Sequence, residues 1–429
     1  MIIFKFGGAS VKDADAVRQL SNIVKSNSGK KLIVVVSAMG KITNALERLI
    51  NSYYNQLPDI DDIFNEIKQF HFDIVNDLFN DNINKEFSID DFKQTVNDVF
   101  IKLNRKINKN PSSDYDFEYD QIICFGEIIS TKIVSAYLNF ININNKWIDV
   151  RDCLKTDNNF REAKVDWEKS SPLVLKNFSF NESNNIYLTQ GFIASSINGY
   201  SSSLGREGSD FTASILAYIL NAKSISVWKD VPGFLNADPK WFDKTEKLDE
   251  ISYQEAIELA FYGAKIIHPK TIKPIQNKSI PLYVRSFLNP EDEGTVIRSI
   301  KHKLDLVPVY IRKQNQVLLS ISPLDFSFII EENISKIFAL FAKYKIKVNL
   351  IQNSAISLSV CISNNTNKFR QLINDLKKEY KVLYNKNVEL ITIRHYTDEA
   401  VNKAIMNKKI LLEQKSRNTA RFVLSDDNL

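Results

Sequence analysis

Short apolar runs alternate with helically spaced apolar residues over the first part of the chain. The runs Ile2–Phe6 and Leu32–Val36 contain almost no polar residues, which is typical of strands buried on both faces. Each run is followed by a polar turn and then by apolar residues at helical spacing, the first helix opening at Asp13. A repeated strand–helix order predicts an α/β fold with a mainly parallel sheet.

The pattern becomes purely helical from residue 59 to 103, where two apolar stripes follow one another. This predicts a helical insertion at about 57–107, and a long helix follows from about Tyr119 to Phe140. Further strands are expected at 147–150 and 186–189, and a helix at 252–262.

Beyond Gly294 the order changes to β-α-β-β-α-β over residues 316–384, and a shorter copy begins at Val388. We therefore predict a first domain at 1–298 and a second region at 305–429, with modules at about 315–384 and 386–429. The second region has no cluster of Lys, His or Asp typical of a catalyst, so we expect it to serve regulation or assembly.

Composition excludes several classes of protein. Of 429 residues, 44% are hydrophobic and 25% charged, as in globular proteins, and the net charge of +5 comes from scattered lysines, which disfavours nucleic-acid binding. Three widely spaced cysteines and four histidines predict neither a disulfide scaffold nor a zinc site. With no signal peptide and no apolar run of about 20 residues, we expect a cytoplasmic protein that does not enter a membrane.

The stretch from Gly199 to Lys240 carries the strongest chemical signal. A loop rich in glycine and serine leads into a helix, with Ser209 or Asp210 as the expected N-cap. A helix start opened by glycines presents free N–H groups and the positive end of the helix dipole, which suits an anion. Arg206 adds a cation that can grip a carboxylate or phosphate at two points.

Lys5 stands inside the first apolar run, directly before Gly7 and Gly8. A buried lysine is costly unless it meets a partner or a cleft, and its place before two glycines favours a cleft over an exposed edge strand. The run is neither a Walker motif nor a dinucleotide fingerprint. Lys229 and Asp230 follow another alternating strand, as residues of an active-site rim would.

Other candidates are weak when taken alone. Ser37 and Thr43 follow the second strand, but Thr43 is more typical of a helix cap than of a ligand. Glu127 beside Gly126 would ordinarily be a solvated residue on a helix face, and Lys265 could meet either a phosphate or a helix C-terminus.

Several motifs together resemble those of the aspartate kinases and occur in that family's order. They cover essentially the whole chain: Lys5-Phe6-Gly7-Gly8-Ala9-Ser10-Val11, Phe125-Gly126-Glu127, Gly205-Arg206-Glu207-Gly208-Ser209-Asp210, Lys229-Asp230-Val231-Pro232-Gly233 and Lys265-Ile266-Ile267-His268-Pro269. The resemblance implies a three-layer α/β/α amino acid kinase fold followed by α+β ferredoxin-like ACT modules, in a form without a fused homoserine dehydrogenase.

The resemblance also implies a reaction. Aspartate kinases transfer the γ-phosphoryl group of ATP to the side-chain carboxylate of L-aspartate, giving 4-phospho-L-aspartate and ADP, the first step toward lysine, threonine and methionine. A carboxylate nucleophile is ionised at pH 7, so the lack of a catalytic histidine agrees with this reaction. Mg²⁺ would arrive with ATP rather than on a protein site.

The family's site residues carry over onto matching positions of this sequence. The implied catalytic residues are Lys5 and Asp210. The implied aspartate-binding residues are Ser37, Thr43, Glu127, Arg206 and Ser209. The implied nucleotide-binding residues are Lys5, Gly7, Gly8, Lys229, Asp230, Leu235, Lys240, Lys265 and Ile266.

This sequence departs from the family at three of these residues and at Glu207, and also at Ala9, where Thr is usual. Lys229 stands where many members have Thr, Leu235 where many have Tyr, Lys240 where Arg is common, and Glu207 where Gly is usual. The nucleotide contacts are therefore the part of the site that the resemblance defines least.

The second region resembles the effector-binding part of lysine-inhibited members around Asn349, Asn353 and Ser354. Those members carry acids where this chain has Asn349 and Ala355, which removes the expected partners for a lysine ammonium. Threonine, another amino acid or no effector remain alternatives. The resemblance also implies a homodimer.

Two other functions stay open from the sequence. One is a kinase for another small amino acid carboxylate, although such relatives lack the Phe125-Gly126-Glu127 motif and the second region. The other is a catalytically silent amino-acid sensor, although a sensor would not need Lys5, Arg206 and Asp210 together.

Overall fold

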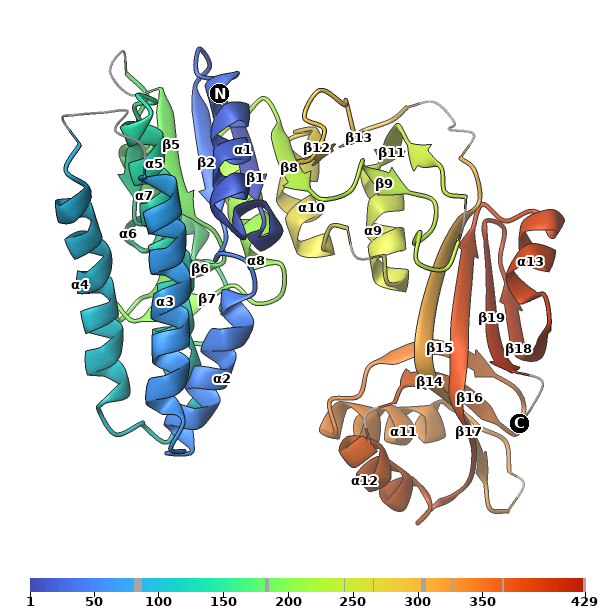
Figure 1. Ribbon diagram of the computed structural model, residues 1–429. Coiled ribbons are helices and arrows are strands. Elements are labelled where there is room, and N and C mark those ends of the chain that lie inside the picture. The colour runs from blue at the N-terminus through green and yellow to red at the C-terminus, as the bar shows by residue number, and fades with distance from the viewer. Residues whose placement is uncertain are drawn as a thin grey trace. The chain divides into compact units, whose positions relative to one another are not determined.

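The computed structural model describes residues 1–80, 87–181, 185–242, 244–264, 266–301, 306–325, 327–364 and 366–426 (Figure 1). The chain forms two compact units. Unit 1 comprises Met1–Phe234, Lys247–Ile257 and Ile266–His302, and unit 2 comprises Leu235–Glu246, Glu258–Lys265 and Lys303–Leu429. The predicted boundary at 305 and the predicted site residue Lys265 lie outside the described residues.

Unit 1 is built on a mostly parallel sheet whose strand order, in the described residues, is β11-β13-β12-β8-β1-β2-β5-β3. β12 and β13 are antiparallel to each other. The central strands are buried along their length, as expected for apolar runs covered on both faces. The strands are β1 (Ile2–Phe6), β2 (Leu32–Val36), β3 (Lys146–Ile148), β5 (Ile186–Gln190), β8 (Ile225–Lys229), β11 (Glu250–Ser252), β12 (Leu282–Ser286) and β13 (Thr295–Arg298).

The helices of unit 1 pack in two groups, α1–α5 in one and α6, α7, α8 and α10 in the other. The predicted helical insertion is the pair α3 and α4. Bounds are η1 (Gly8–Val11), α1 (Ala14–Lys25), α2 (Ile42–Tyr54), α3 (Ile60–Leu78), α4 (Ile89–Ile107), α5 (Tyr115–Phe140), α6 (Val150–Cys153), α7 (Trp167–Asn177), α8 (Gly208–Leu220) and α10 (Pro269–Asn277). A further helix, α9 (Tyr253–Tyr262), is divided, with residues 253–257 in unit 1 and 258–262 in unit 2.

Helix α5 differs from the expectation that no apolar run reaches the length of a membrane span. It has 26 residues and is apolar enough to cross a bilayer by length and composition. Most of its apolar window is buried inside the protein, which is the behaviour of a core helix. Burial on all sides explains why its sequence lacks a polar stripe.

Two small sheets lie beside these elements. One has the order β4-β6-β7 and the other the order β10-β9. Their bounds are β4 (Lys155–Thr156), β6 (Ile193–Ser196), β7 (Ser201–Ser203), β9 (Phe234–Leu235) and β10 (Lys247–Leu248).

Unit 2 is an antiparallel sheet with helices, in the strand order β15-β16-β14-β17-β19-β18. The predicted strands and helices are all present, but β14 and β17 are single strands of 15 residues. β14 begins before the first predicted module, and β17 runs from the first predicted module into the second. The bounds are β14 (Val309–Pro323), α11 (Glu331–Lys343), β15 (Val348–Asn353), β16 (Leu358–Ser363), α12 (Thr366–Leu376), β17 (Tyr380–Arg394), α13 (Asp398–Ile405), β18 (Lys408–Lys415) and β19 (Thr419–Asp426).

The continuity of β14 and β17 has a local cause. Asn315 and Asn387 adopt positive φ values of 51° and 57°, and the strand register shifts next to Asn315. Asparagine tolerates this conformation, so the two strands bend without ending. Residues 385–387, at the predicted junction of the two modules, are exposed residues within one strand.

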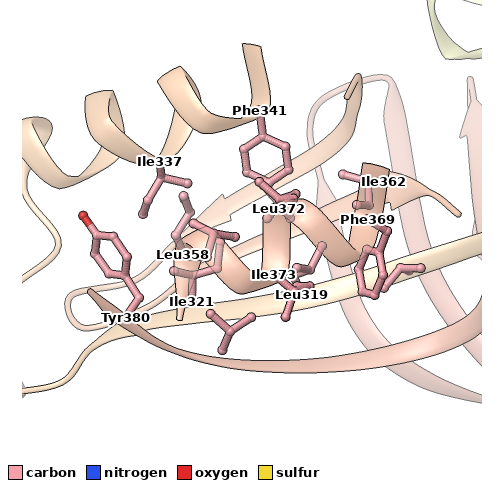
Figure 2. Close-up of a cluster of buried hydrophobic side chains, with 14 of the residues drawn as sticks. Leu319, Ile321, Ile337, Phe341, Leu358, Ile362, Phe369, Leu372, Ile373 and Tyr380 are labelled. Atoms are coloured by element: carbon pink, nitrogen blue, oxygen red, sulfur yellow. The ribbon is translucent and has the colours of Figure 1, made fainter. Parts of the chain in front are cut away.

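One hydrophobic core of unit 2 lies between its sheet and the helices α11 and α12 (Figure 2). Phe341 of α11 and Leu372 of α12 are buried against sheet residues such as Leu319 and Ile362. Such burial of large apolar side chains is the main stabilising contribution available to a unit of this size.

We predict that Phe341→Ala destabilises unit 2 by about 3–5 kcal/mol, because it removes a side chain that is 2% exposed and leaves a cavity. The matched control is Phe328→Ala, whose ring is 69% exposed and whose loss should change stability by no more than about 0.5 kcal/mol. Native-state hydrogen exchange of the β14 and β16 amides measures both effects within unit 2. Equal losses of protection in the two variants would contradict this account of the core.

Candidate active site

The candidate site lies at the carboxyl edge of the parallel strands of unit 1. Lys5, next to last in β1, is only 8% exposed, and its Nζ lies 2.7 Å from Oδ1 of Asp210. Asp210 is in the first turn of α8 and is 2% exposed. The partner of Lys5 is therefore a buried carboxylate. Lys5 and Asp210, the two residues that the resemblance implies to be catalytic, are in contact.

Lys229 adds a second cation to this pair. It ends β8, the strand beside β1, and its Nζ lies 3.9 Å from Oδ2 of Asp210. Burial alone would raise the pKa of Asp210, but the charges of Lys5 and Lys229 outweigh burial and leave that pKa below its usual value. Two ammonium groups around one carboxylate leave a net positive charge at the end of the strands, which suits an anionic ligand.

Gly7 and Gly8 bring backbone close to this charge. A Cβ on Gly7 would lie 3.5 Å from Nζ of Lys5. A Cβ on Gly8 would lie 2.8 Å from the carbonyl oxygen of Gly40, and the Gly40 N–H donates to the Gly8 carbonyl at 3.0 Å. The loops after β1 and β2 are thus held together by a contact that only glycine permits at position 8.

The start of α8 differs from the prediction that Ser209 or Asp210 is its N-cap. The N-cap is Glu207, and both predicted residues lie in the first turn. Glu207 has a φ of 53°, which is strained for a residue other than glycine. Its Oε2 is buried without a hydrogen-bond partner among the described residues, and burial raises the pKa of this carboxyl.

Ser37 and Ser209 join the loop after β2 to the first turn of α8. Oγ of Ser37 donates to Oγ of Ser209 at 3.0 Å. A Cβ on Gly191, which follows β5, would lie 2.5 Å from Cβ of Ser209. The missing side chain of Gly191 therefore lets the end of β5 close onto the start of α8.

Glu127 of α5 is fully enclosed beside the same loop. Its side chain is 3% exposed, and Oε1 accepts a long hydrogen bond of 3.4 Å from the Ala38 N–H. Burial raises the pKa of Glu127 to about 8. Gly126 makes this approach possible, since a Cβ there would lie 3.1 Å from Cβ of Ala38 and 2.9 Å from Cδ1 of Leu46.

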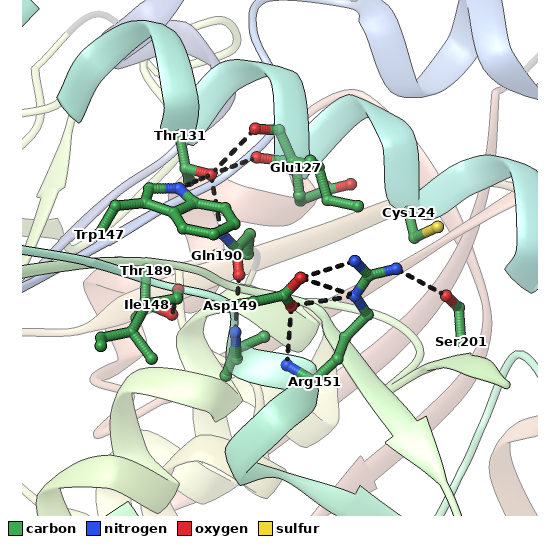
Figure 3. A network of polar contacts seen from close by, with 12 residues as sticks. Cys124, Glu127, Thr131, Trp147, Ile148, Asp149, Arg151, Thr189, Gln190 and Ser201 are labelled. Carbon is green, nitrogen blue, oxygen red and sulfur yellow. Dashed lines mark hydrogen bonds and ion pairs between the residues drawn. The ribbon is translucent and has the colours of Figure 1, made fainter. Parts of the chain in front are cut away.

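A polar network that the sequence analysis missed holds α5 against the sheet (Figure 3). The Thr131 hydroxyl donates to the Glu127 carbonyl at 2.8 Å and accepts from Nε2 of Gln190 at 2.9 Å and Nε1 of Trp147 at 3.0 Å. Oε1 of Gln190 accepts from the Val150 N–H at 2.8 Å. The sequence signal that could have predicted this network is Gln190, an uncharged polar residue at the end of a buried strand.

Other predicted residues are not gathered in this way. Thr43 is half-buried in the first turn of α2, whereas Arg206 and Asp230 are exposed. Ile266 belongs to unit 1, and its carbonyl accepts a hydrogen bond from Nζ of Lys229. Leu235 and Lys240 belong to unit 2.

The predicted effector residues also lie in unit 2. Asn349 is 9% exposed, and its amide is engaged by Gln316 at 2.8 Å, Ser363 at 3.1 Å and Lys313 at 3.0 Å. Asn353 and Ser354 are exposed. Of the three, Asn349 is thus a structural side chain in this state of the protein.

A family model matches the part of the chain that forms this sheet. The model described as the Amino acid kinase family matches residues 1–286. The chain belongs to the amino acid kinase family. The matched part includes each predicted site residue of unit 1 as well as Leu235, Lys240 and Lys265.

Curated relatives of this amino acid kinase are aspartokinases. Over 363 residues it is 29% identical to lysine-sensitive aspartokinase 3 of Escherichia coli (strain K12), an alignment that covers 84% of this chain and 78% of the relative. It is 27% identical to chloroplastic aspartokinase 2 of Arabidopsis thaliana, covering 84% of this chain and 66% of that protein.

Solved structures give the same result. E. coli aspartokinase III in complex with aspartate and ADP has a TM-score of 0.81 and 25% identity, and the match covers all of this chain (100%) and 97% of that one. The aspartate kinase of Clostridium acetobutylicum has a TM-score of 0.78 and 25% identity, covering 99% and 96%. The fold of an amino acid kinase with the regulatory part of an aspartokinase thus extends over both units.

A resident metal site is not evident in the parts of the chain that the structure describes. Those residues contain no group of three or more His, Cys, Asp or Glu side chains that could hold a metal ion. The charges gathered at the strand ends include the ammonium groups of Lys5 and Lys229 and the carboxylate of Asp210.

We predict that Glu207→Gly stabilises unit 1, because a left-handed backbone costs a residue other than glycine about 1 kcal/mol, part of which the larger unfolded-state entropy of glycine offsets. Glu207→Gln is the matched control, since it removes the charge and keeps the strained backbone. Thermal unfolding should give a higher midpoint for Glu207→Gly than for Glu207→Gln. An equal rise in both variants would mean that the buried carboxyl, and not the backbone, is the unfavourable element.

Proposed function

We propose that this protein is an aspartate kinase that phosphorylates the side-chain carboxylate of L-aspartate with ATP. The observation that carries the proposal is the buried Lys5–Asp210 pair, with Lys229 beside it, at the carboxyl edge of a parallel sheet. The aspartokinase relatives, which match most of the chain, support the same reaction.

The chemistry needs charge neutralisation and positioning more than acid–base catalysis. An oxygen of the aspartate side-chain carboxylate forms a bond to the γ-phosphorus of ATP, and the bond from that phosphorus to the β–γ bridging oxygen breaks. The electron pair leaves on ADP, and no proton is transferred. Lys5 lies against the transferring group in this proposal, Asp210 orients Lys5, and the Gly7 and Gly8 backbone faces the phosphates.

The substrate is held through its other charges. Arg206 grips a carboxylate of aspartate, and Glu127 takes the ammonium group. Ser37, Thr43 and Ser209 supply hydroxyl groups. The hydrogen bond between Ser37 and Ser209 supports a shared role, because it places both hydroxyls at one point of the strand edge.

By the resemblance to aspartate kinases, the nucleotide is assigned to Lys229, Asp230 and Ile266, and also to Leu235, Lys240 and Lys265. Mg²⁺ bound with ATP would supply further charge neutralisation, in addition to that from Lys5 and Lys229. An E. coli relative was solved in complex with aspartate and ADP, which supports ATP as the donor.

Residues 1–298 act as the catalytic domain and 305–429 as a regulatory region of two ACT modules in this proposal. The amino acid effector, if one binds, contacts Asn353 and Ser354, and the protein works as a cytoplasmic homodimer. The E. coli relative was solved with lysine and aspartate, which supports an amino acid effector in the family. The buried Asn349 and the absence of an acid at Ala355 favour an effector other than lysine.

The reaction itself is tested by ADP release from Mg-ATP with L-aspartate, coupled to hydroxylamine trapping of the acyl phosphate. An aspartate-dependent hydroxamate is expected, and parallel reactions with glutamate and N-acetylglutamate separate other amino acid kinases. Lysine and threonine are then added to test the effector. Aspartate binding without hydroxamate would favour the silent sensor.

We predict that Lys5→Met lowers kcat at least about 100-fold, because it removes a positive charge from the transferring phosphoryl group while keeping most of the buried stem. The control is Lys12→Met, whose side chain is 63% exposed and should leave kcat unchanged. Circular dichroism of both variants establishes that the fold is kept. A folded Lys5→Met protein with near-normal kcat would exclude this catalytic role.

We predict that the KM for L-aspartate falls as pH rises from 6 to 8 and then levels off. Glu127 is mostly protonated below its pKa of about 8, so binding the substrate ammonium must release its proton, which costs at most about tenfold in affinity per pH unit. Glu127→Gln cannot ionise and should show a raised KM with little pH dependence. An unchanged pH profile in Glu127→Gln, or an effect confined to the KM for ATP, would rule out the role of Glu127.

A further inference from the structure

A second cavity of unit 1 lies on the sheet face opposite to Lys5. It has a volume of about 430 Å³ and is lined by β1, β8 and β12, the residues that follow α1, and the loop after β12. Phe4 of β1 lines it, and because side chains of neighbouring strand residues point to opposite faces, Lys5 points away from it. The cavity is therefore distinct from the candidate active site.

Two buried hydrogen-bond donors in the cavity wall lack a partner. Trp228 is 3% exposed, and its indole Nε1 has no hydrogen-bond acceptor among the described residues. The same holds for Nε of Arg285 on the adjoining strand β12. Buried donors are rarely left without an acceptor in native proteins, so both groups together indicate that an acceptor binds here.

The charged and aromatic residues that line the cavity limit which chemical classes of acceptor can bind there. The guanidinium carbon of Arg285 lies 5.1 Å from the ring centre of Tyr283 and 5.9 Å from that of Trp228. Lys30 is a second cation in the lining and Glu291 an acid, which leaves a net charge of one. A singly charged anion matches this balance, whereas a phosphate dianion would exceed the net charge of the lining and would also face Glu291.

We propose that this cavity binds a small carboxylate with an aromatic or branched apolar body. The carboxylate accepts from Nε1 of Trp228 and from the guanidinium of Arg285, and the apolar body packs on Phe4 and Tyr283. The volume lies in the range of ordinary small-molecule sites. Glu291 offers a partner for an ammonium group, so the ligand is either a plain carboxylate or an α-amino acid.

The indole N–H of Trp228 provides a direct readout of binding. The protein has four tryptophans, so the ¹⁵N-labelled full chain should give four indole signals, and Trp228→Phe identifies the one from residue 228. The probe is 3-phenylpropionate, titrated with L-aspartate at saturation so that the candidate active site stays occupied. A saturable shift of the Trp228 signal is expected, with at least tenfold weaker binding of the neutral 3-phenylpropionamide.

Variants test which cation holds the carboxylate. Arg285→Gln should weaken 3-phenylpropionate at least tenfold, whereas Arg298→Gln on the neighbouring strand β13 does not touch the cavity and should leave binding unchanged. Tighter binding of L-phenylalanine than of 3-phenylpropionate would identify an amino acid ligand, and weaker binding a plain carboxylate. A Trp228 signal that does not move, or equal binding of acid and amide, overturns the proposal.

Discussion

The buried ion pair between Lys5 and Asp210 is the constraint on which unit 1 depends. Asp210 is 2% exposed and Lys5 is 8% exposed, and burying either charge without a partner would be very costly. The two charges are tolerated because they lie close enough to form an ion pair. Lys5 is carried by the central strand β1 and Asp210 by the first turn of α8. Their contact therefore fixes where α8 meets the sheet, and with it the positions of Ser209 and Glu207.

Close contacts at three glycines fix the positions of the loops and helices around this ion pair. Gly8 brings the loops after β1 and β2 together, Gly126 lets α5 approach Ala38, and Gly191 lets β5 approach Ser209. In each case a Cβ would come within about 3 Å of its neighbour. Packing against the sheet thus leaves little freedom to the groups that surround Lys5, which is what positioning a phosphoryl group requires.

Part of this arrangement could be predicted from the sequence. The rest could not be predicted, and in each case the physical reason can be named. Lys5 could be predicted because a charged residue in an apolar run needs a partner, and the strands because buried parallel strands are continuous apolar runs. The role of Asp210 came only from the resemblance to aspartate kinases. The N-cap of α8 was predicted wrongly, since Glu207 adopts a strained conformation that local propensity does not favour. The bonds of Thr131 and Gln190 join residues 59 positions apart, and only the tertiary fold brings these two residues together.

Two carboxylates of unit 1 respond to burial in opposite ways, and this difference assigns their parts in the proposed reaction. Asp210 has two ammonium groups beside it and keeps its charge, so it can organise Lys5 and Lys229 whether or not substrate is bound. Glu127 is stabilised by backbone N–H groups such as that of Ala38, but burial outweighs them and raises its pKa to about 8. An entering cation would favour the charged form of Glu127, so in the proposed reaction Glu127 is suited to receive an ammonium group and Asp210 to hold the catalytic lysines.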